Sequence, residues 1–414
     1  MNPIFKYFLD ALKASLHGEA VSWDGVCQAD DLRQLVQLSS VQMVLPMIYE
    51  AVGRCPDWQK LPPQEDMQIR MAVIRAAAKQ AAGTQRFLKM YGEMSREGLT
   101  PLVVKGIICR NLYPNPDERI SSDEDLCVAP EQLTQVREFL EQNGFVYEDA
   151  GQTEEHMNEF TYRRSDGLYL EVHKRLFAED SSAYGDWERF FADAHDRKMS
   201  VQIEGTDVFT MNETDHFFYL ICHAFKHFLH SGVGIRQICD ILLFSQNFGS
   251  DIDWKEVYNH CREIRADVLT ATFAEIGVRY LGFSAAELHF PEEWLAMHQD
   301  PDNLIGDLLE AGVYGLSSPE RAHSSNITLS AKKGGASGRT ADLLYTVFPS
   351  REVLINRYPY LQKHRWMLFF AWISRIFSYY KGERSHSGNN AAAKTLEIGE
   401  KRVELLRQYK VIDE

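Results

Sequence analysis

Three consecutive acidic residues, Asp123, Glu124 and Asp125, run directly into an apolar stretch within the sequence RISSDEDLCV. Acidic clusters usually lie on solvated helices or in loops, whereas this one leads into a run typical of a buried β-strand. In a strand the side chains alternate between the two faces, so Asp123 and Asp125 are expected on one face and Glu124 on the other. Two carboxylates about 6.5 Å apart, two residues along a strand that rises about 3.3 Å per residue, repel each other unless a cation neutralises them. The pattern indicates a divalent metal site, and the alternative is a solvated acidic turn at the start of a strand.

A second strand supplies another acid in an apolar setting. In LYLEVHKRL, Leu170 and Val172 share one face, and Glu171 and His173 share the other. An acid in an apolar strand needs a partner, so Glu171 is a candidate third carboxylate of the metal site. The alternatives are an ion pair between Glu171 and Arg163 or Arg164, and a structural hydrogen bond for His173.

Periodicity and turn residues divide the chain into helical parts around an α+β centre. Apolar residues at helical spacing dominate the first hundred residues, and short apolar strands follow, separated by glycine and proline. No internal repeat is evident. We expect five segments: a helical region at 1–98, an α+β core at 99–210, a helical domain at 211–315, a mobile loop or linker at 316–340, and a helical region at 341–414.

Composition excludes several classes of protein. A net charge of −15 argues against long nucleic acids as the main partner, because polymer phosphates require a basic surface. The seven cysteines are scattered without a C-x-x-C pair, which favours reduced thiols in a cytoplasmic protein. Charges within the first turns argue against a signal peptide. The aromatic stretch 366–380 is interrupted by Arg375 and is shorter than the roughly 20 residues that span a bilayer. We therefore expect a buried helix there and no transmembrane segment, with peripheral membrane contact as the alternative.

The order of these motifs resembles the DNA polymerase β-like nucleotidyltransferase superfamily, and most closely its bacterial family of uncharacterised nucleotidyltransferases. The matching stretches are VVKGIICRNLYP, RISSDEDLCVAP and LEVHKRL, followed by HAFKHF and IRQICDI. The resemblance implies an α+β fold in which a small mixed sheet with flanking helices is surrounded by N- and C-terminal helical segments.

The resemblance also implies an activity and roles for named residues. It implies transfer of a nucleoside monophosphate from a nucleoside triphosphate to a hydroxyl of a small molecule or protein, with Mg²⁺ or Mn²⁺ as cofactor. Asp123, Asp125 and Glu171 would be the catalytic metal ligands. The triphosphate would be bound by Lys105 and Arg119 and approached closely by the backbone at Gly106. Otherwise, Lys105 is an exposed strand end and Arg119 pairs with Glu118 or Asp117.

Two departures from the superfamily pattern support a second hypothesis. The usual Gly-Ser pair is replaced by Lys105-Gly106, and Glu124 stands where an apolar residue is usual. A protein with this fold and weak or lost catalysis could instead bind nucleotide or substrate as a regulatory module.

Two histidines in the helical part are candidates for a substrate pocket. His223 and His227 have the i, i+4 spacing of zinc sites but lack the glutamate of H-E-x-x-H. We expect packing or hydrogen bonding in the pocket for them. Lys226 and Arg236 are expected in solvated positions, and the alternative is that they reach an anionic substrate. The nucleotide base, the acceptor and the oligomeric state do not follow from the sequence.

Overall fold

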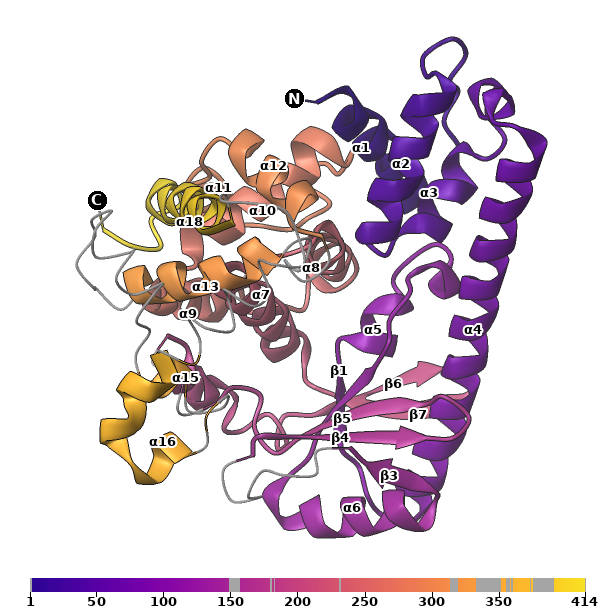
Figure 1. Ribbon diagram of the computed structural model, residues 1–414. Coiled ribbons are helices and arrows are strands. Elements are labelled where there is room, and N and C mark those ends of the chain that lie inside the picture. Colours follow the sequence, from indigo (N-terminus) through magenta and orange to yellow (C-terminus); the bar gives the residue numbers. More distant parts are fainter. Residues whose placement is uncertain are drawn as a thin grey trace.

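The chain begins with helices that lead into one very long helix. The computed structural model describes residues 2–148, 157–178, 181, 183–230, 232–312, 319–332, 351–354, 358, 360–372, 374 and 391–413. The first helices are α1 (Pro3–Leu16), α2 (Ala29–Val41), α3 (Leu45–Val52) and α4 (Pro63–Arg96), with a 3₁₀ turn at Pro56–Lys60. Pro46 lies in the first turn of α3, where its missing N–H costs nothing, so it starts a helix. Helix α4 runs along one whole side of the molecule (Figure 1).

A five-stranded mixed sheet forms the centre. In spatial order its strands are β1 (Leu102–Val104), β2 (Glu124–Cys127), β5 (Tyr169–His173), β4 (Glu159–Arg164) and β3 (Phe145–Tyr147). Strands β2 and β5 are parallel, and the other neighbouring pairs are antiparallel. Helix α5 (Gly106–Arg110) follows β1, and helix α6 (Leu133–Gln142) follows β2 and the 3₁₀ turn at Pro130–Gln132. The structure thus confirms the predicted α+β class with a small mixed sheet.

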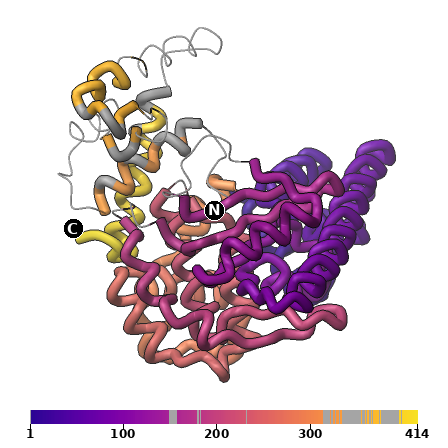
Figure 2. The backbone as a smooth tube through the Cα atoms, turned by 90° about the horizontal axis from the view of Figure 1, so that it is seen from below, coloured from indigo at the N-terminus to yellow at the C-terminus, as the bar shows by residue number. Residues whose placement is uncertain are grey.

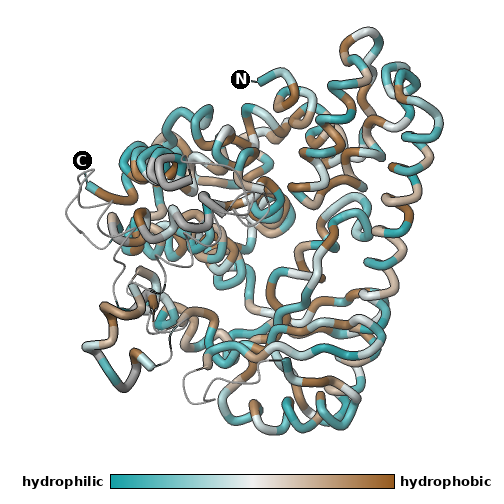
Figure 3. Tube along the Cα trace, in the orientation of Figure 1, coloured by the Kyte–Doolittle hydropathy of each residue, from teal (hydrophilic) through white to brown (hydrophobic). Residues whose placement is uncertain are grey.

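The two faces of this sheet meet different hydrophobic cores. One core contains Val103, Leu126 and Val172 of the sheet with residues of α4 and α6. The other contains Leu102 and Val104 with residues of α1–α3 and of the later helices. Strand β1 is hydrophobic along its length because both of its faces are covered (Figure 3). Asp125 lies two residues before Cys127, which belongs to the core that contains the later helices, so the two side chains share one face of β2. Asp125 therefore points toward the later helices.

Those later elements cover the face of the sheet that carries the acids. A hairpin of β6 (Met199–Ile203) and β7 (Thr206–Thr210) precedes them, and helix α7 follows this hairpin directly. The helices are α7 (Glu213–His230), α8 (Ile235–Phe248), α9 (Trp254–Ile264), α10 (Asp267–Tyr280), α11 (Glu292–Leu295), α12 (Asp302–Ala311), α13 (Pro319–Lys332), α15 (Arg351–Leu354), α16 (Tyr360–Lys363) and α18 (Ala391–Gln408). Further 3₁₀ turns span Pro116–Glu118, Gly185–Phe191 and Arg365–Met367. Among the described helices, none has the length and hydropathy needed to cross a bilayer.

Two expectations for the C-terminal third are wrong. Residues 319–332, predicted as part of a mobile loop, form α13, since Ile327 is buried against α18 and the Thr328 hydroxyl donates to the Leu229 carbonyl of α7 at 2.6 Å. The rest of 316–340 lies outside the described residues. The aromatic stretch is not uniformly buried, because Trp366 is 70% and Phe370 51% exposed.

The five-segment division stays a proposal, and its first and third segments share one core. The C-terminal elements α13, α15, α16 and α18 gather on one side of the molecule, opposite α4 (Figure 2).

Candidate active site

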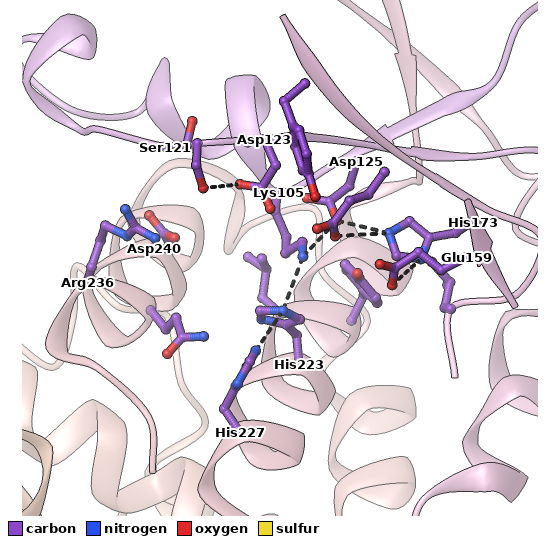
Figure 4. A pocket seen from close by; sticks show the side chains of 18 of the residues that line it. Lys105, Ser121, Asp123, Asp125, Glu159, His173, His223, His227, Arg236 and Asp240 are labelled. Atoms are coloured by element: carbon purple, nitrogen blue, oxygen red, sulfur yellow. Dashed lines mark hydrogen bonds and ion pairs between the residues drawn. The ribbon is translucent and has the colours of Figure 1, made fainter. Parts of the chain in front are cut away.

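Strand register brings the predicted acids together. Asp125 of β2 pairs with Glu171 of the parallel strand β5, and Cys127 pairs with His173. Ligand atoms of Asp125, Glu171 and His173 all lie within 4.8 Å of one another, which makes this trio a possible metal site. The trio faces a cavity of about 730 Å³ between the sheet and helices α7 and α8 (Figure 4). The cavity is lined by all nine residues singled out from the sequence: Lys105, Gly106, Arg119, Asp123, Asp125, Glu171, His173, His223 and His227.

Asp125 is the most enclosed carboxylate of the cavity, at 3% exposure. Its Oδ1 lies 3.0 Å from the Lys105 ammonium and accepts a hydrogen bond from His173 Nε2 at 3.0 Å. Burial alone would raise the pKa of Asp125, but these two donors hold the pKa well below its usual range. Asp125 is therefore an anion, as a metal ligand must be.

The surroundings of Glu171 shift its pKa in the opposite direction. Burial, and then the nearby charges of Asp125, Glu159 and Asp123, raise the pKa of Glu171 to about 8. Its Oε2 lies 3.8 Å from His173 Nε2. The ion pair with Arg163 or Arg164 is not formed, because these arginines pair with Glu148 and Asp166. A cation close to Glu171 would relieve the crowding of negative charge.

Asp123 lies just before β2, half-buried and on the same side of the strand as Asp125. It lines the cavity, and the Ser122 hydroxyl donates to its Oδ1 at 3.2 Å. The trio of possible metal ligands contains His173 and not Asp123. The sequence thus anticipated two members of the trio, and a metal-binding role for Asp123 stays a prediction.

Lys105 is half-buried at the junction of β1 and α5, with 15% of its side chain exposed, so the predicted exposed position at a strand end is wrong. Its φ of +55° lies in the left-handed region that side chains rarely adopt, and its N–H donates to His216 Nε2 at 3.1 Å. Burial lowers the pKa of its ammonium, but Asp125 and other neighbours outweigh this and raise the pKa well above the ordinary value. Lys105 is therefore a charged lysine held in a strained backbone conformation at the centre of the cavity.

The two predicted pocket histidines continue the chain of contacts from Lys105. The Lys105 ammonium lies 3.1 Å from His223 Nε2, which lies 3.2 Å from His227 Nε2. An ammonium can only donate, so His223 Nε2 accepts from Lys105. Burial lowers the pKa of both rings, that of His227 to about 3, so both are neutral. The prediction of hydrogen bonding in the pocket fits this geometry.

Glu124 points to the other face of β2, as strand parity predicts. Its carboxylate accepts from the backbone N–H of Ile107 at 2.8 Å and forms a buried ion pair with Arg110. A Cβ on Gly106, whose φ is +30°, would overlap the Oε2 of Glu124. Close packing against Glu124 therefore accounts for glycine at this position.

Arg119 has a structural partner that the sequence did not reveal. Its guanidinium binds both oxygens of Asp240, and the Tyr113 hydroxyl donates to Oδ1 of the same carboxylate at 2.7 Å. Pairing with Glu118 or Asp117 is therefore wrong, and binding of triphosphate by Arg119 would compete with Asp240. Asp240 lies 121 residues along the chain, where no local sequence signal marks it.

The helical wall of the cavity contains cations that were expected in solvent. Arg236 is buried and donates to the Ile120 carbonyl, and Lys226 is half-buried. Both line the cavity, so the expectation of solvated positions is wrong. In Figure 4, Arg236 and Asp240 lie at one end of the cavity and His173 and Glu159 at the other, with Lys105 and Asp125 between them.

The donor set at the trio fits a divalent cation. Asp125 and Glu171 supply the oxygen atoms that Mg²⁺ prefers, and His173 supplies a nitrogen that Mn²⁺ and later transition metals accept more readily. Alternatively, His173 can keep its hydrogen bond to Asp125 and orient that carboxylate toward the ion.

One comparison with known proteins, that with family models, agrees with the earlier resemblance. A family model described as uncharacterised nucleotidyltransferase matches residues 28–280, which is more than half of the chain. No curated protein matches. The crystal structure of an antigenic nucleotidyltransferase-like protein from Paracoccidioides brasiliensis aligns with 49% of this chain and 94% of its own, at 14% identity. Its TM-score of 0.30 is too low to support a conclusion. On the match over residues 28–280, the chain belongs to the family of uncharacterised nucleotidyltransferases.

Proposed function

We propose that this protein is a metal-dependent nucleotidyltransferase that moves a nucleoside monophosphate from a nucleoside triphosphate to a hydroxyl of a small molecule or protein. One observation carries the proposal: Asp125, Glu171 and His173 converge within 4.8 Å on the floor of a cavity of about 730 Å³. That volume lies within the range of about 300–1,000 Å³ typical of small-molecule sites.

A bound divalent ion would supply Lewis-acid stabilisation of charge on the phosphate oxygens and the attacking hydroxyl. Asp125 and Glu171 would hold it, and Asp123, just before β2, lines the same cavity. Glu171 would ligate this ion or help to take the proton of the acceptor hydroxyl. The hydroxyl oxygen would form its bond to the α-phosphorus as the bond to pyrophosphate breaks.

Lys105 and Gly106 would serve the triphosphate. Gly106 opens α5 and lines the cavity, and the Lys105 ammonium lies inside the cavity. Arg119 is the weaker candidate, because phosphate would have to compete with its bidentate contact to Asp240.

Pyrophosphate release tests the proposal. Each nucleoside triphosphate is incubated with Mg²⁺ or Mn²⁺ and a panel of hydroxyl acceptors. We expect Glu171→Gln to reduce turnover about 100-fold or more, because it removes the carboxylate that would serve as metal ligand or proton acceptor. The matched control is Glu397→Gln, an exposed carboxylate on α18 that should leave turnover unchanged. Equal rates in the wild type and Glu171→Gln would refute the assignment.

A second candidate function, nucleotide or substrate binding without transfer, is favoured by one observation. Glu124, which accepts from the Ile107 N–H and pairs with Arg110, is an acid where the superfamily pattern has an apolar residue. Nucleotide binding without pyrophosphate release for any acceptor would support this candidate over the enzyme.

A further inference from the structure

The Lys105 ammonium lies where a metal ion would have to act. Asp125 Oδ1 is approached by Lys105 Nζ and His173 Nε2, each at 3.0 Å, and Asp125 is almost fully enclosed. A divalent ion that binds Oδ1 of this carboxylate must therefore displace at least one of the two donors. Lys105 is the donor that carries a full positive charge, so it is the one that opposes a second cation.

Lys105 is fixed at both ends, unlike a surface lysine that samples many positions. Its ammonium contacts His223 Nε2 as well as Asp125. Its backbone is anchored to His216, whose Nδ1 contacts the Thr210 hydroxyl at 3.1 Å, and that hydroxyl donates to the Val103 carbonyl at 2.7 Å. The position of the ammonium is therefore built into the fold.

We propose that Lys105 is a resident cation that keeps free divalent metal off Asp125, and that the phosphates of an incoming nucleotide release it. This inference rests on the proposed function for the identity of the releasing ligand. A triphosphate provides anionic oxygens that can bind the Lys105 ammonium in place of Asp125. The metal ion that accompanies the triphosphate then binds the Asp125 carboxylate. Metal and nucleotide would then bind together, and Lys105 would move from carboxylate to phosphate within the reach of one side chain.

Several charged groups around the ammonium decide whether this exchange is favourable. Asp123, Glu159 and Glu171 attract cations to the sheet side, whereas Lys226 and Arg236 on α7 and α8 repel them. A lone divalent ion would meet Lys105 and the cationic helical wall together. A metal already bound to phosphates brings its own negative charge and avoids that repulsion.

Calorimetric titration with Mn²⁺ tests the exchange, with and without a non-hydrolysable α,β-methylene nucleotide. For the wild type we expect Mn²⁺ to bind at least about tenfold more tightly when the nucleotide is present. Lys105→Met should bind Mn²⁺ without nucleotide at least about tenfold more tightly than the wild type, because the competing charge is gone. Lys105→Arg should restore weak binding, and Lys401→Met, an exposed control on α18, should match the wild type.

The two wild-type titrations need no variant, so the test survives if Lys105→Met fails to fold. Asp125→Asn should abolish the high-affinity binding and so identify the site. Equal Mn²⁺ affinity for wild type and Lys105→Met without nucleotide, or no effect of nucleotide on the wild type, would overturn the exchange. If no nucleotide binds but Lys105→Met still gains Asp125-dependent affinity, the proposed function fails while the resident-cation role stands. If turnover occurs without that gain, the inference fails and the function stands.

Discussion

At the scale of single residues, Glu124 is the clearest departure from the superfamily pattern, and the structure gives it a role. A buried carboxylate is costly unless it is paired and hydrogen-bonded, and Glu124 has both Arg110 and the Ile107 N–H. Its carboxylate fills the space beside Gly106 and fixes the start of α5 against β2. The residue that first argued against catalysis thus also orders the turn that carries Lys105.

Gly106→Ala tests this packing. The added methyl would meet the Glu124 carboxylate at a backbone φ of +30°, so we expect a loss of about 2 kcal/mol or more in the free energy of unfolding. Urea denaturation measures this loss. Part of it should disappear in a Glu124→Ala background, and strictly additive effects of the two substitutions would contradict the contact.

At the scale of elements, two buried carboxylates tie distant segments together. Asp240 of α8 joins Arg119, which precedes β2, so the helical wall of the cavity is fastened to the strand that carries Asp125. Asp57 joins the first loop of the chain to the 3₁₀ turn after α3, because it accepts from the backbone N–H groups of Gly25, Val26 and Cys27.

Removing one partner of the Arg119–Asp240 pair should lower the free energy of unfolding far more than replacing both partners by apolar residues. Asp240→Leu leaves a buried guanidinium without its carboxylate, and we expect a loss of about 3–5 kcal/mol in the free energy of unfolding. The double variant Arg119→Met/Asp240→Leu should recover much of that loss, because it removes both charges. Chemical denaturation of the two single variants and the double variant measures this. A double variant as unstable as the sum of the single variants would show that the pair is not the cause.

Asp57 predicts a pH dependence of stability. Burial opposes ionisation of Asp57, but Lys60 and the three backbone donors lower its pKa to about 2. Because the folded-state pKa is depressed, the stabilisation is present above about pH 4 and is lost as pH falls toward about 2. Asp57→Asn should therefore lower the urea midpoint at pH 6, and the gap to wild type should shrink below pH 4. A gap independent of pH would exclude ionisation as its source.

At the scale of the whole molecule, the cavity lies between the sheet and helices that come later in the chain. The sheet contributes the acids, and α7 and α8 contribute histidines and cations from at least 50 residues farther along the chain. Alternation along each strand, read from the sequence, correctly placed Asp125, Glu171 and His173 on one side and Glu124 on the other. Strand register was not predictable, and it is the register that sets Asp125 beside Glu171.

Long-range partners account for the errors of the sequence interpretation. The pairing of Arg119 with Asp240 and the burial of Arg236 depend on how α8 packs against the loop before β2, which local patterns do not encode. Residues 319–332 are rich in serine and weakly periodic, and they form α13 because α7 and α18 pack against them. Tertiary packing overrides local propensity in such segments.

Nucleotide binding dependent on Asp125 is the most direct test of the central claim. We expect calorimetry to detect binding of at least one nucleoside triphosphate with Mg²⁺ or Mn²⁺ to the wild type. Asp125→Asn should weaken that binding about tenfold or more, because the neutral amide is a much poorer metal ligand. Glu397→Gln should match the wild type. Wild-type affinity in Asp125→Asn, or the absence of nucleotide binding in the presence of either metal, would contradict the assignment of this cavity as a metal–nucleotide site.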